Sequence, residues 1–263
     1  MVLKSEHYTF GDTDLAAQRL RLLARVFEPS SARLLGGLAD AGGALGVDLG
    51  CGPGYTTKLV AEHVALERVV GLDQSPRLLE RAARESASER VSFEQWDVSI
   101  APLPVPRADF LYSRFLLTHL SDPAAVVHAW AGAALPNARL VLEETAYMRG
   151  EHPAFPRYYA LVERMQAHYG QRMYIGQELA RLSASPDWIV ESAQIAPSRL
   201  PAQDMAALHF HNLQTWSSDA FAKANYDAAE LRDLGRELEQ IANGELSAPP
   251  VSLGMGQAIL RRR

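Results

Sequence analysis

The feature that most constrains this chain is a glycine-rich turn that follows a short apolar segment. The apolar segment covers residues 44–49 and includes Asp48, and Gly50, Gly52 and Gly54 come directly after it. Glycine tolerates positive φ angles and has no Cβ, so a ligand can lie directly against such a backbone. In an open α/β sheet, a strand, turn and helix of this kind place the ligand beyond the carboxyl ends of the strands. The turn therefore indicates a ligand site, although glycine also serves tight turns that bind nothing.

The spacing of the glycines separates the candidate ligands. A GxGxG pattern that contains Pro53 departs from the GxGxxG fingerprint of dinucleotide sites, and it lacks the GK[ST] sequence of a phosphate-binding P-loop. Asp73 ends the next apolar segment, where a carboxylate can accept hydrogen bonds from both ribose hydroxyls. Asp97 ends the third and can accept from an exocyclic amino group such as that of adenine. Together they favour an adenosine compound over a diphosphate, although Asp97 alone could be a helix cap or turn residue.

Helical and apolar segments alternate along the first part of the chain, as parallel βαβ units require. An amphipathic helix over residues 15–27 comes first, with Arg19 among the residues that face away from its apolar side. Strands are predicted over 44–49, 68–72, 91–96, 108–113 and 139–143, and helices over 55–65, 76–86 and 123–134. Three prolines in 101–106 predict a loop in the third crossover. The pattern predicts an α/β fold with a doubly wound sheet.

After Thr145 the pattern becomes more helical. It predicts helices over 152–170, 176–183, 203–222 and 227–242, and strands over 188–195 and 251–260. The interruption of ~45 residues between the last two strands is too helical for a loop and is typical of a lid. We expect a single domain over 1–263 with an N-terminal helical segment over 1–40, a cofactor-binding core over 44–145, and helical cap elements over 150–187 and 201–244.

Composition excludes several partners and compartments. The 263 residues include 26 lysines and arginines against 31 acidic residues, a formal charge of −5, so nucleic acid and anionic membrane surfaces are poor candidates. The only basic run, Arg261 to Arg263, is interpreted as a solvated terminus. A lone cysteine, Cys51, cannot form an intrachain disulfide, and no apolar stretch approaches the ~20 residues of a transmembrane helix. We expect a cytoplasmic protein, a monomer or a homodimer.

Three segments resemble a known family. Residues 47–54, 70–76 and 97–98 are similar to the first three motifs of class I S-adenosylmethionine-dependent methyltransferases, over about 8–145. The resemblance implies a Rossmann-like, doubly wound, seven-stranded sheet, with S-adenosylmethionine as cofactor and S-adenosylhomocysteine as product. It further implies that Asp48 orients the methionine end, that Asp73 binds the ribose and that Gln74 lies beside the adenine. Asp97 with Val98 would bind the adenine amino group, and close backbone contacts would come from Gly50, Cys51, Gly52 and Gly54.

The segment 109–123 resembles the menaquinone and ubiquinone methyltransferase-like branch of that family. In that branch the backbone at the end of the fourth strand, here Ser113 and Arg114, faces the methionine part of the cofactor. Tyr8 is similar to an aromatic residue that closes over the cofactor there, although a surface or hinge tyrosine would look the same.

The acceptor of the methyl group leaves weaker signals. Methyl transfer is an in-line displacement that mainly requires the acceptor to be held in line, and a base helps an acceptor that carries a proton. His119 is the candidate base, or else it caps or packs beneath the next helix. The acidic pair Glu143 and Glu144 either meets a cationic amine or is solvated. A flat or partly apolar acceptor would be lined by aromatic and histidine residues outside the sheet, unless these are core residues: Tyr147, Tyr158, Tyr159, His209 and His211.

The leading hypothesis is methyl transfer from S-adenosylmethionine to a small organic acceptor, on oxygen, nitrogen or carbon, with secondary metabolism as one setting. The alternatives are a protein that binds the cofactor but catalyses a reaction without methylation, such as a cyclisation, and a non-catalytic sensor of adenosine compounds. No metal is predicted, because the fourth and fifth strand ends lack the cluster of oxygen ligands that magnesium requires.

Overall fold

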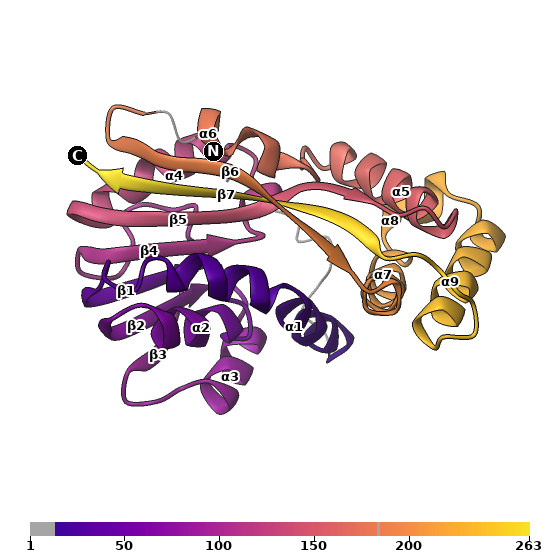
Figure 1. Ribbon diagram of the computed structural model, residues 1–263, viewed down its shortest axis with the longest axis horizontal. Coiled ribbons are helices and arrows are strands. Elements are labelled where there is room, and N and C mark those ends of the chain that lie inside the picture. The colour runs from indigo at the N-terminus through magenta and orange to yellow at the C-terminus, as the bar shows by residue number, and fades with distance from the viewer. Residues whose placement is uncertain (1–13, 183–184) are drawn as a thin grey trace.

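A seven-stranded sheet forms the centre of the computed structural model, which describes residues 14–182 and 185–263. Its strand order is β3-β2-β1-β4-β5-β7-β6 (Figure 1). The strands pair in parallel except β7, which is antiparallel to both of its neighbours. They are β1 (Gly43–Leu49), β2 (Leu66–Asp73), β3 (Val91–Gln95), β4 (Ala108–Arg114), β5 (Ala134–Arg149), β6 (Trp188–Leu200) and β7 (Val251–Arg262). The predicted Rossmann-like, doubly wound sheet with an N-terminal helix is confirmed.

Strand order explains where a ligand can bind. The chain runs outward from β1 through β2 to β3, and then returns to pair β4 with the other side of β1. The topological switch point therefore lies between β1 and β4, where crevices form beyond the carboxyl ends of the strands. The glycine-rich turn that follows β1 lies at this point.

Helices cover both faces of the parallel part of the sheet. The second half of α1 (Asp14–Gly36) and α2 (Tyr55–His63) cover one face, where the fully buried Phe110 and Tyr112 lie. On the other face, α4 (Pro123–Trp130) and α6 (Leu179–Leu182) pack against residues of β1, β4 and β5. The remaining helix of this part is α3 (Pro76–Glu85), and three short 3-10 helices are η1 (Leu117–His119), η2 (Ala131–Ala133) and η3 (Ile175–Glu178).

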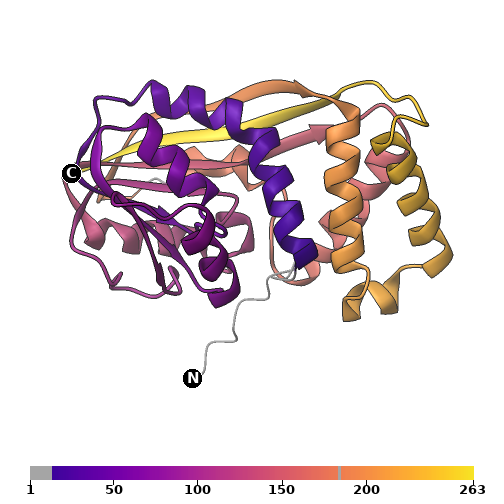
Figure 2. The same cartoon turned by 90° about the horizontal axis from the view of Figure 1, so that it is seen from below.

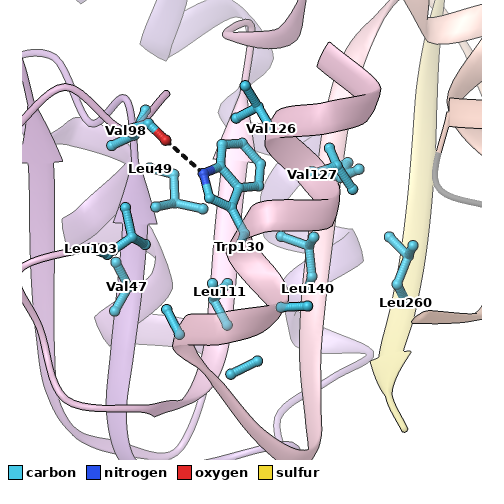
Figure 3. Packing of buried hydrophobic residues seen from close by; sticks show 14 of the residues in the cluster. Val47, Leu49, Val98, Leu103, Leu111, Val126, Val127, Trp130, Leu140 and Leu260 are labelled. Atoms are coloured by element: carbon cyan, nitrogen blue, oxygen red, sulfur yellow. Dashed lines mark hydrogen bonds between the residues drawn. The ribbon is translucent and has the colours of Figure 1, made fainter. Parts of the chain in front are cut away.

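Trp130 ties α4 to the loop after β3. Its ring is buried among Leu49, Leu111 and Leu140, and its Nε1 donates a hydrogen bond of 2.8 Å to the carbonyl oxygen of Val98 (Figure 3). Asp97 precedes this anchored residue. The core thus fixes the backbone of a segment that the sequence assigns to the ligand site.

A second hydrophobic core lies beyond the parallel sheet. It is formed by α5 (Ala154–His168), α7 (Ala202–Trp216), α8 (Ala220–Asn225) and α9 (Ala228–Ala242), which we call the outer helices. Figure 1 shows β5, β7 and β6 extending from the main sheet to the outer helices, and Figure 2 shows α1 running between the main sheet and α7. In the described ranges, no helix has both the length and the apolar character needed to cross a membrane.

Several predicted boundaries are wrong. The strand predicted over 139–143 is the 16-residue β5, because its outer half continues to pair with β7 as far as Arg149. The helix predicted over 203–222 is two helices, because Asp219 accepts hydrogen bonds from the backbone N–H groups of Phe221 and Ala222 and so caps a new helix. The helix predicted over 176–183 is η3 followed by the short α6. The loop predicted over 101–106 is confirmed.

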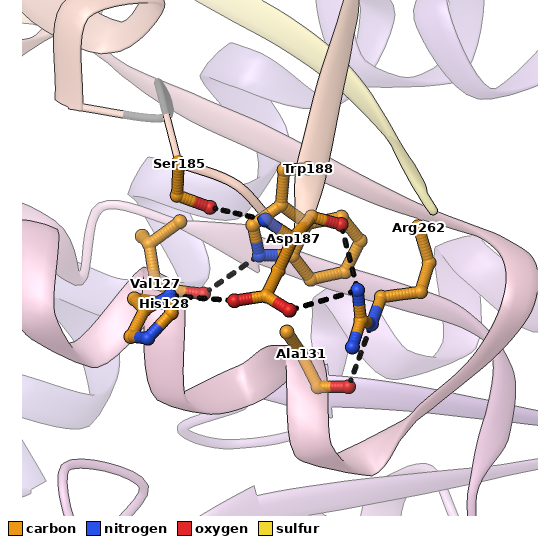
Figure 4. A network of polar contacts seen from close by, with 7 residues as sticks. All are labelled: Val127, His128, Ala131, Ser185, Asp187, Trp188 and Arg262. Carbon is orange, nitrogen blue, oxygen red and sulfur yellow. Dashed lines mark hydrogen bonds and ion pairs between the residues drawn. The ribbon is translucent and has the colours of Figure 1, made fainter.

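The interpretation of the C-terminal arginines as a solvated terminus is also wrong, because β7 includes Arg261 and Arg262. Arg262 Nη1 lies 3.0 Å from Asp187 Oδ1, and its Nε donates to the carbonyl oxygen of Ala131 at 3.1 Å. His128 Nδ1 lies 2.9 Å from Asp187 Oδ2, as Figure 4 shows. These contacts join α4, the start of β6 and the end of β7.

Candidate functional site

The glycine-rich turn adopts the conformation for which glycine is suited. Gly50, Gly52 and Gly54 have φ angles of 74°, 53° and 83°. A Cβ added at Gly54 would lie 2.6 Å from the ring of Phe93, so this glycine lets helix and sheet pack closely. A Cβ at Gly52 would have no neighbour within 4 Å, so its backbone faces open space. Of these glycines, Gly52 is therefore the one that a ligand can approach directly.

Asp73 is bound to this turn. Its Oδ2 accepts a hydrogen bond from the Gly52 N–H at 2.8 Å, and its Oδ1 accepts one from the Ser75 N–H at 2.9 Å. A carboxylate offers about four acceptor positions, so these two donors do not exhaust it. Asp97 Oδ1 accepts from the N–H and the hydroxyl of Ser99, at 3.0 and 2.6 Å. Both carboxylates are thus fixed by local hydrogen bonds at the ends of their strands.

One cavity of about 510 Å³ joins these groups to the outer helices. This volume lies in the range of small-molecule sites. Its wall is formed by the strand ends on one side and by residues of α1, α5 and α7 on the other. Eight of the residues predicted for the cofactor line it, namely Gly50, Cys51, Gly52, Asp73, Gln74, Asp97, Val98 and Arg114. Three residues predicted for catalysis or the acceptor also line it, namely His119, Tyr158 and His209.

Other predicted residues do not line this cavity. Gly54 packs on Phe93, and the Ser113 hydroxyl donates to the carbonyl oxygen of Leu49 at 3.1 Å. Tyr147 packs on Gly254 of β7. The Tyr159 hydroxyl lies behind the wall, 3.3 Å from His209 Nε2. The remaining two are Asp48 and His211, and Tyr8 lies outside the described residues.

Asp48 supports the turn from behind. Its Oδ2 accepts hydrogen bonds from the hydroxyls of Thr56 at 2.6 Å and Thr57 at 2.7 Å, both in the first turn of α2. Burial raises the pKa of Asp48 to about 6, while the two threonines and the charge of Arg114 oppose the rise. Its Oδ1 has no hydrogen-bond partner among the described residues. The side chain therefore links β1 to α2 across the glycine-rich turn.

His119 ends η1 and is partly buried. Burial, and then the positive charge of Arg19, lower its pKa to about 4, against a hydrogen bond with Gln171 that raises it. The imidazole is consequently neutral at pH 7. A neutral imidazole in the cavity wall can accept a proton from, or orient, an acceptor group.

Glu143 and Glu144 are not solvated, since their exposed fractions are 0% and 1%. Glu143 accepts from the Tyr112 hydroxyl at 2.5 Å and from Gln257 Nε2 at 2.8 Å. Glu144 lines the cavity, and its Oε1 accepts from the N–H groups of Leu116 at 2.8 Å and Leu117 at 2.6 Å. Burial raises the pKa of Glu144 to about 8. Both glutamates hold strand ends and the loop that carries His119 in place.

Sequence reasoning missed the polar residues that α1, α5 and α7 contribute to the wall, namely Arg19, Gln166 and Asn212. It placed Arg19 on a face of the first helix turned away from its apolar side, whereas only 5% of Arg19 is exposed. The reason is that α1 packs against α7 as well as the sheet, so two of its faces are covered. The available signal was helical spacing: Asn212 follows His209 by three positions, and Gln166 follows Tyr158 by eight.

Comparison with known proteins agrees with this geometry. Residues 47–142, which include the glycine-rich turn and both acids, match the family described as "Methyltransferase domain". This segment is therefore similar to a methyltransferase domain, and the seven-stranded sheet with its antiparallel β7 is the fold of class I methyltransferases. Trans-aconitate 2-methyltransferase from Methylobacterium nodulans is 36% identical over 129 residues, which cover 49% of this chain and 48% of the relative. The chain spans 48%, 44% and 37% of the first three curated relatives that it matches, so about half their length or less.

Two solved structures are similar in fold to this chain over 88% of its length. A candidate methyltransferase from Bacillus halodurans has a TM-score of 0.57 at 15% identity, covering 88% of this chain and 97% of its own. The [4+2]-cyclase SpnF has a TM-score of 0.54 at 18% identity, covering 88% of this chain and 80% of its own.

A methyltransferase domain implies S-adenosylmethionine as its cofactor, and the residues of the cavity fit such a molecule. The open side of Gly52 admits a ligand against backbone, and the carboxylates of Asp73 and Asp97 line the same cavity. Residues 14–182 and 185–263 contain no group of three or more His, Cys, Asp or Glu side chains that could hold a metal ion.

Proposed function

We propose that this protein transfers a methyl group from S-adenosylmethionine to a small organic acceptor. The observation that carries the proposal is the single cavity that runs from the glycine-rich turn, Asp73 and Asp97 to the outer helices. Its first part suits an adenosine with a short polar extension, and its volume leaves a further compartment for an acceptor. The compartment opens next to the strand ends, as in-line transfer requires.

The cofactor residues have distinct proposed roles. Asp73 accepts from the ribose hydroxyls, Gln74 flanks the adenine, and Asp97 with Val98 binds its amino group. Backbone at Gly50, Cys51 and Gly52, with Ser113 and Arg114 from the end of β4, faces the methionine part. Gly54 and Asp48 shape the turn, since Gly54 packs on Phe93 and Asp48 binds two threonines of α2. Tyr8 closes over the cofactor.

The bound cofactor supplies a methyl group on a sulfonium, and a new bond to the acceptor atom forms as the carbon–sulfur bond breaks. The protein's part is to orient the acceptor and to exclude water. His119 is the proposed base for an acceptor that loses a proton, and its neutral form leaves a nitrogen able to take that proton. Glu144 keeps the loop with His119 in position through the N–H groups of Leu116 and Leu117.

Several finer assignments belong to the same proposal. The segment 109–123 supports placement in the menaquinone and ubiquinone methyltransferase-like branch. Residues 44–145 act as the cofactor-binding core, 1–40 as a helical segment over the cofactor, and 150–187 with 201–244 as a cap over the acceptor. The whole chain acts as one domain, without a metal, in the cytoplasm, as a monomer or homodimer, and the wall of the cavity comes from a single chain.

Incubation of the purified protein with S-adenosylmethionine labelled in its methyl group, and with a library of small acceptors, tests the proposal. Calorimetry with S-adenosylhomocysteine runs in parallel. We expect micromolar binding of S-adenosylhomocysteine and transfer of label to a subset of acceptors. Absence of both binding and transfer would refute the proposal.

The fold shared with SpnF does not decide between methylation and a cyclisation, because fold alone does not determine chemistry. The same assay separates the alternatives. A product that forms while the labelled methyl group remains on the cofactor would identify a reaction without methylation. Cofactor binding without any product would favour a sensor.

A further inference from the structure

Three helices meet at the inner end of the cavity, and each turns one stripe of residues into it. On α7 the stripe is Met205, Leu208, His209 and Asn212, and on α5 it is Tyr158, Val162 and Gln166. These spacings of three and four residues place each set on one face of its helix. Arg19 enters from α1. We call the space lined by Arg19, Tyr158, Gln166, His209 and Asn212 the inner chamber.

The inner chamber contains buried polar atoms that lack partners. Tyr158, Gln166 and His209 have exposed fractions of 1%, 4% and 2%. By distance and angle, the Tyr158 hydroxyl, Gln166 Oε1 and His209 Nδ1 have no hydrogen-bond partner among the described residues. Trp216 and Asn212 nevertheless lie close enough to the Tyr158 oxygen to influence its pKa. Burying a polar atom without a partner is unfavourable, so such atoms in one cavity wall indicate a polar ligand. The Tyr158 hydroxyl can donate to that ligand, whereas Gln166 Oε1 can only accept and would need a donor group of the ligand or a water molecule.

The inner chamber contains one cationic side chain, that of Arg19. Arg19 Nη1 donates a hydrogen bond of 3.3 Å to Asn212 Oδ1, which holds the guanidinium against α7. Arg19 acts on two wall residues, because its charge lowers the pKa of both His119 and Tyr158. No carboxylate is among the groups that shift the pKa of His119, Tyr158 or His209. A guanidinium in this wall can pair with a negative oxygen of a ligand.

The groups around the Tyr158 oxygen indicate which kind of ligand atom this part of the cavity stabilises. Burial raises the pKa of its phenol to about 12, and Trp216, Asn212 and Arg19 all oppose that rise. Groups that lower the pKa of an acid do so by stabilising its anion. The Trp216 indole can only donate, and its Nε1 has no partner among the described residues. The donors and the cation near this oxygen therefore suit an oxygen anion.

We propose that the inner chamber binds a carboxylate of the acceptor, so that the substrates of this protein are organic acids. The guanidinium of Arg19, the Tyr158 hydroxyl and the Asn212 amide hold the carboxylate, and the apolar body of the acid packs on Val162, Met205 and Leu208. Arginine suits this role because its fork of N–H groups matches carboxylate geometry. This inference rests on the proposed methyl transfer, since it names the class of acceptor for that reaction.

Calorimetry on the full chain, saturated with S-adenosylhomocysteine, tests the inference. The probes are aliphatic and aromatic mono-, di- and tricarboxylates of increasing length, each matched with its primary amide. We expect at least one acid to bind tenfold or more tightly than its amide. Equal binding of acids and amides, or binding of no acid by the loaded protein, would overturn the inference. Failure of S-adenosylhomocysteine itself to bind would instead refute the proposed function.

Substitutions test which residues produce the preference for an acid over its amide. Arg19→Met should abolish the preference for acid over amide, and so should Asn212→Asp, which is isosteric and places a negative charge beside the guanidinium. Arg25→Met is the matched control, because Arg25 lies on the same helix but is exposed and pairs with Asp204 at 3.1 Å. A preference that survives Arg19→Met, or survives the folded Asn212→Asp variant, would overturn the inference.

The cofactor has a carboxylate of its own, on its methionine part, and a second comparison separates the two sources. S-Adenosylhomocysteine carries this carboxylate, whereas 5′-methylthioadenosine lacks it. We expect Arg19→Met to change the affinity for each compound less than twofold. A tenfold loss confined to S-adenosylhomocysteine would show that Arg19 binds the cofactor, and would overturn the assignment to the acceptor.

Discussion

Replacement of Asp73 by alanine tests the cofactor end of the cavity. In the free protein this carboxylate accepts hydrogen bonds from the N–H groups of Gly52 and Ser75. Alanine removes the acceptor for both, and it removes the proposed acceptor for the ribose hydroxyls. The substitution should therefore weaken the cofactor complex through lost contacts and through a less ordered turn at Gly52.

The two effects differ in size. Gly52 and Ser75 are only half-buried, so water can replace the lost carboxylate, and we expect unfolding free energy to fall by about 1 kcal/mol. Hydrogen bonds from ribose hydroxyls to a charged carboxylate contribute about 2 kcal/mol to binding. This corresponds to an increase of about 30-fold in the dissociation constant.

Calorimetric titration with S-adenosylhomocysteine measures the change, and urea unfolding measures the stability of the same samples. Glu94→Ala is the matched control, because Glu94 is an exposed acid of the neighbouring strand β3 and does not line the cavity. We expect the control to bind within twofold of the wild type. An unchanged dissociation constant for a folded Asp73→Ala variant would refute the assignment of this residue to the ribose.

Three further substitutions test other parts of the account. His119→Ala should lower kcat at least tenfold while leaving the affinity for S-adenosylhomocysteine within twofold, and an equal kcat would remove His119 from the reaction. The pKa of Glu144 is about 8 in the folded protein, against an ordinary value of 4.5. Between these values the folded state keeps a proton that the unfolded state has released. The free energy of unfolding therefore falls as the pH rises toward 8. Between pH 6.5 and 8 the melting temperature of Glu144→Gln should fall less than that of the wild type, and parallel slopes would contradict this assignment. Trp130→Phe loses the hydrogen bond to the Val98 carbonyl and should destabilise the protein by about 1–2 kcal/mol in urea unfolding; an unchanged midpoint would show that this bond contributes nothing.

The parallel part of the fold was accessible from the sequence because its signals are local. Buried parallel strands appear as short apolar runs, and turn glycines and strand-end acids follow them directly. For this reason the alternation from 44 to 143 predicts the sheet, and Gly52, Asp73 and Asp97 line one cavity as strand ends at a switch point should. The class of ligand came from the spacing of these residues together with a family resemblance.

The inner half of the cavity was not accessible in this way, because it depends on contacts between segments far apart in the chain. The position of Arg19 in the sequence of the helix is that of a solvated residue. In the structure Arg19 is buried because α7 packs against α1. Glu143 and Glu144 follow an apolar run, as exposed residues often do, and they are buried because Gln257 and the N–H groups after β4 bind them. Hydrophobic periodicity and secondary-structure propensity describe one segment at a time, so they cannot identify partners from distant segments.

A crystal structure of the protein with S-adenosylhomocysteine tests the central claim most directly. We expect the ribose hydroxyls on Asp73, the adenine between Gln74 and Val98, and the sulfur directed from the glycine-rich turn toward the inner chamber. Binding of S-adenosylhomocysteine elsewhere, or in this cavity with its sulfur directed away from the inner chamber, would contradict it.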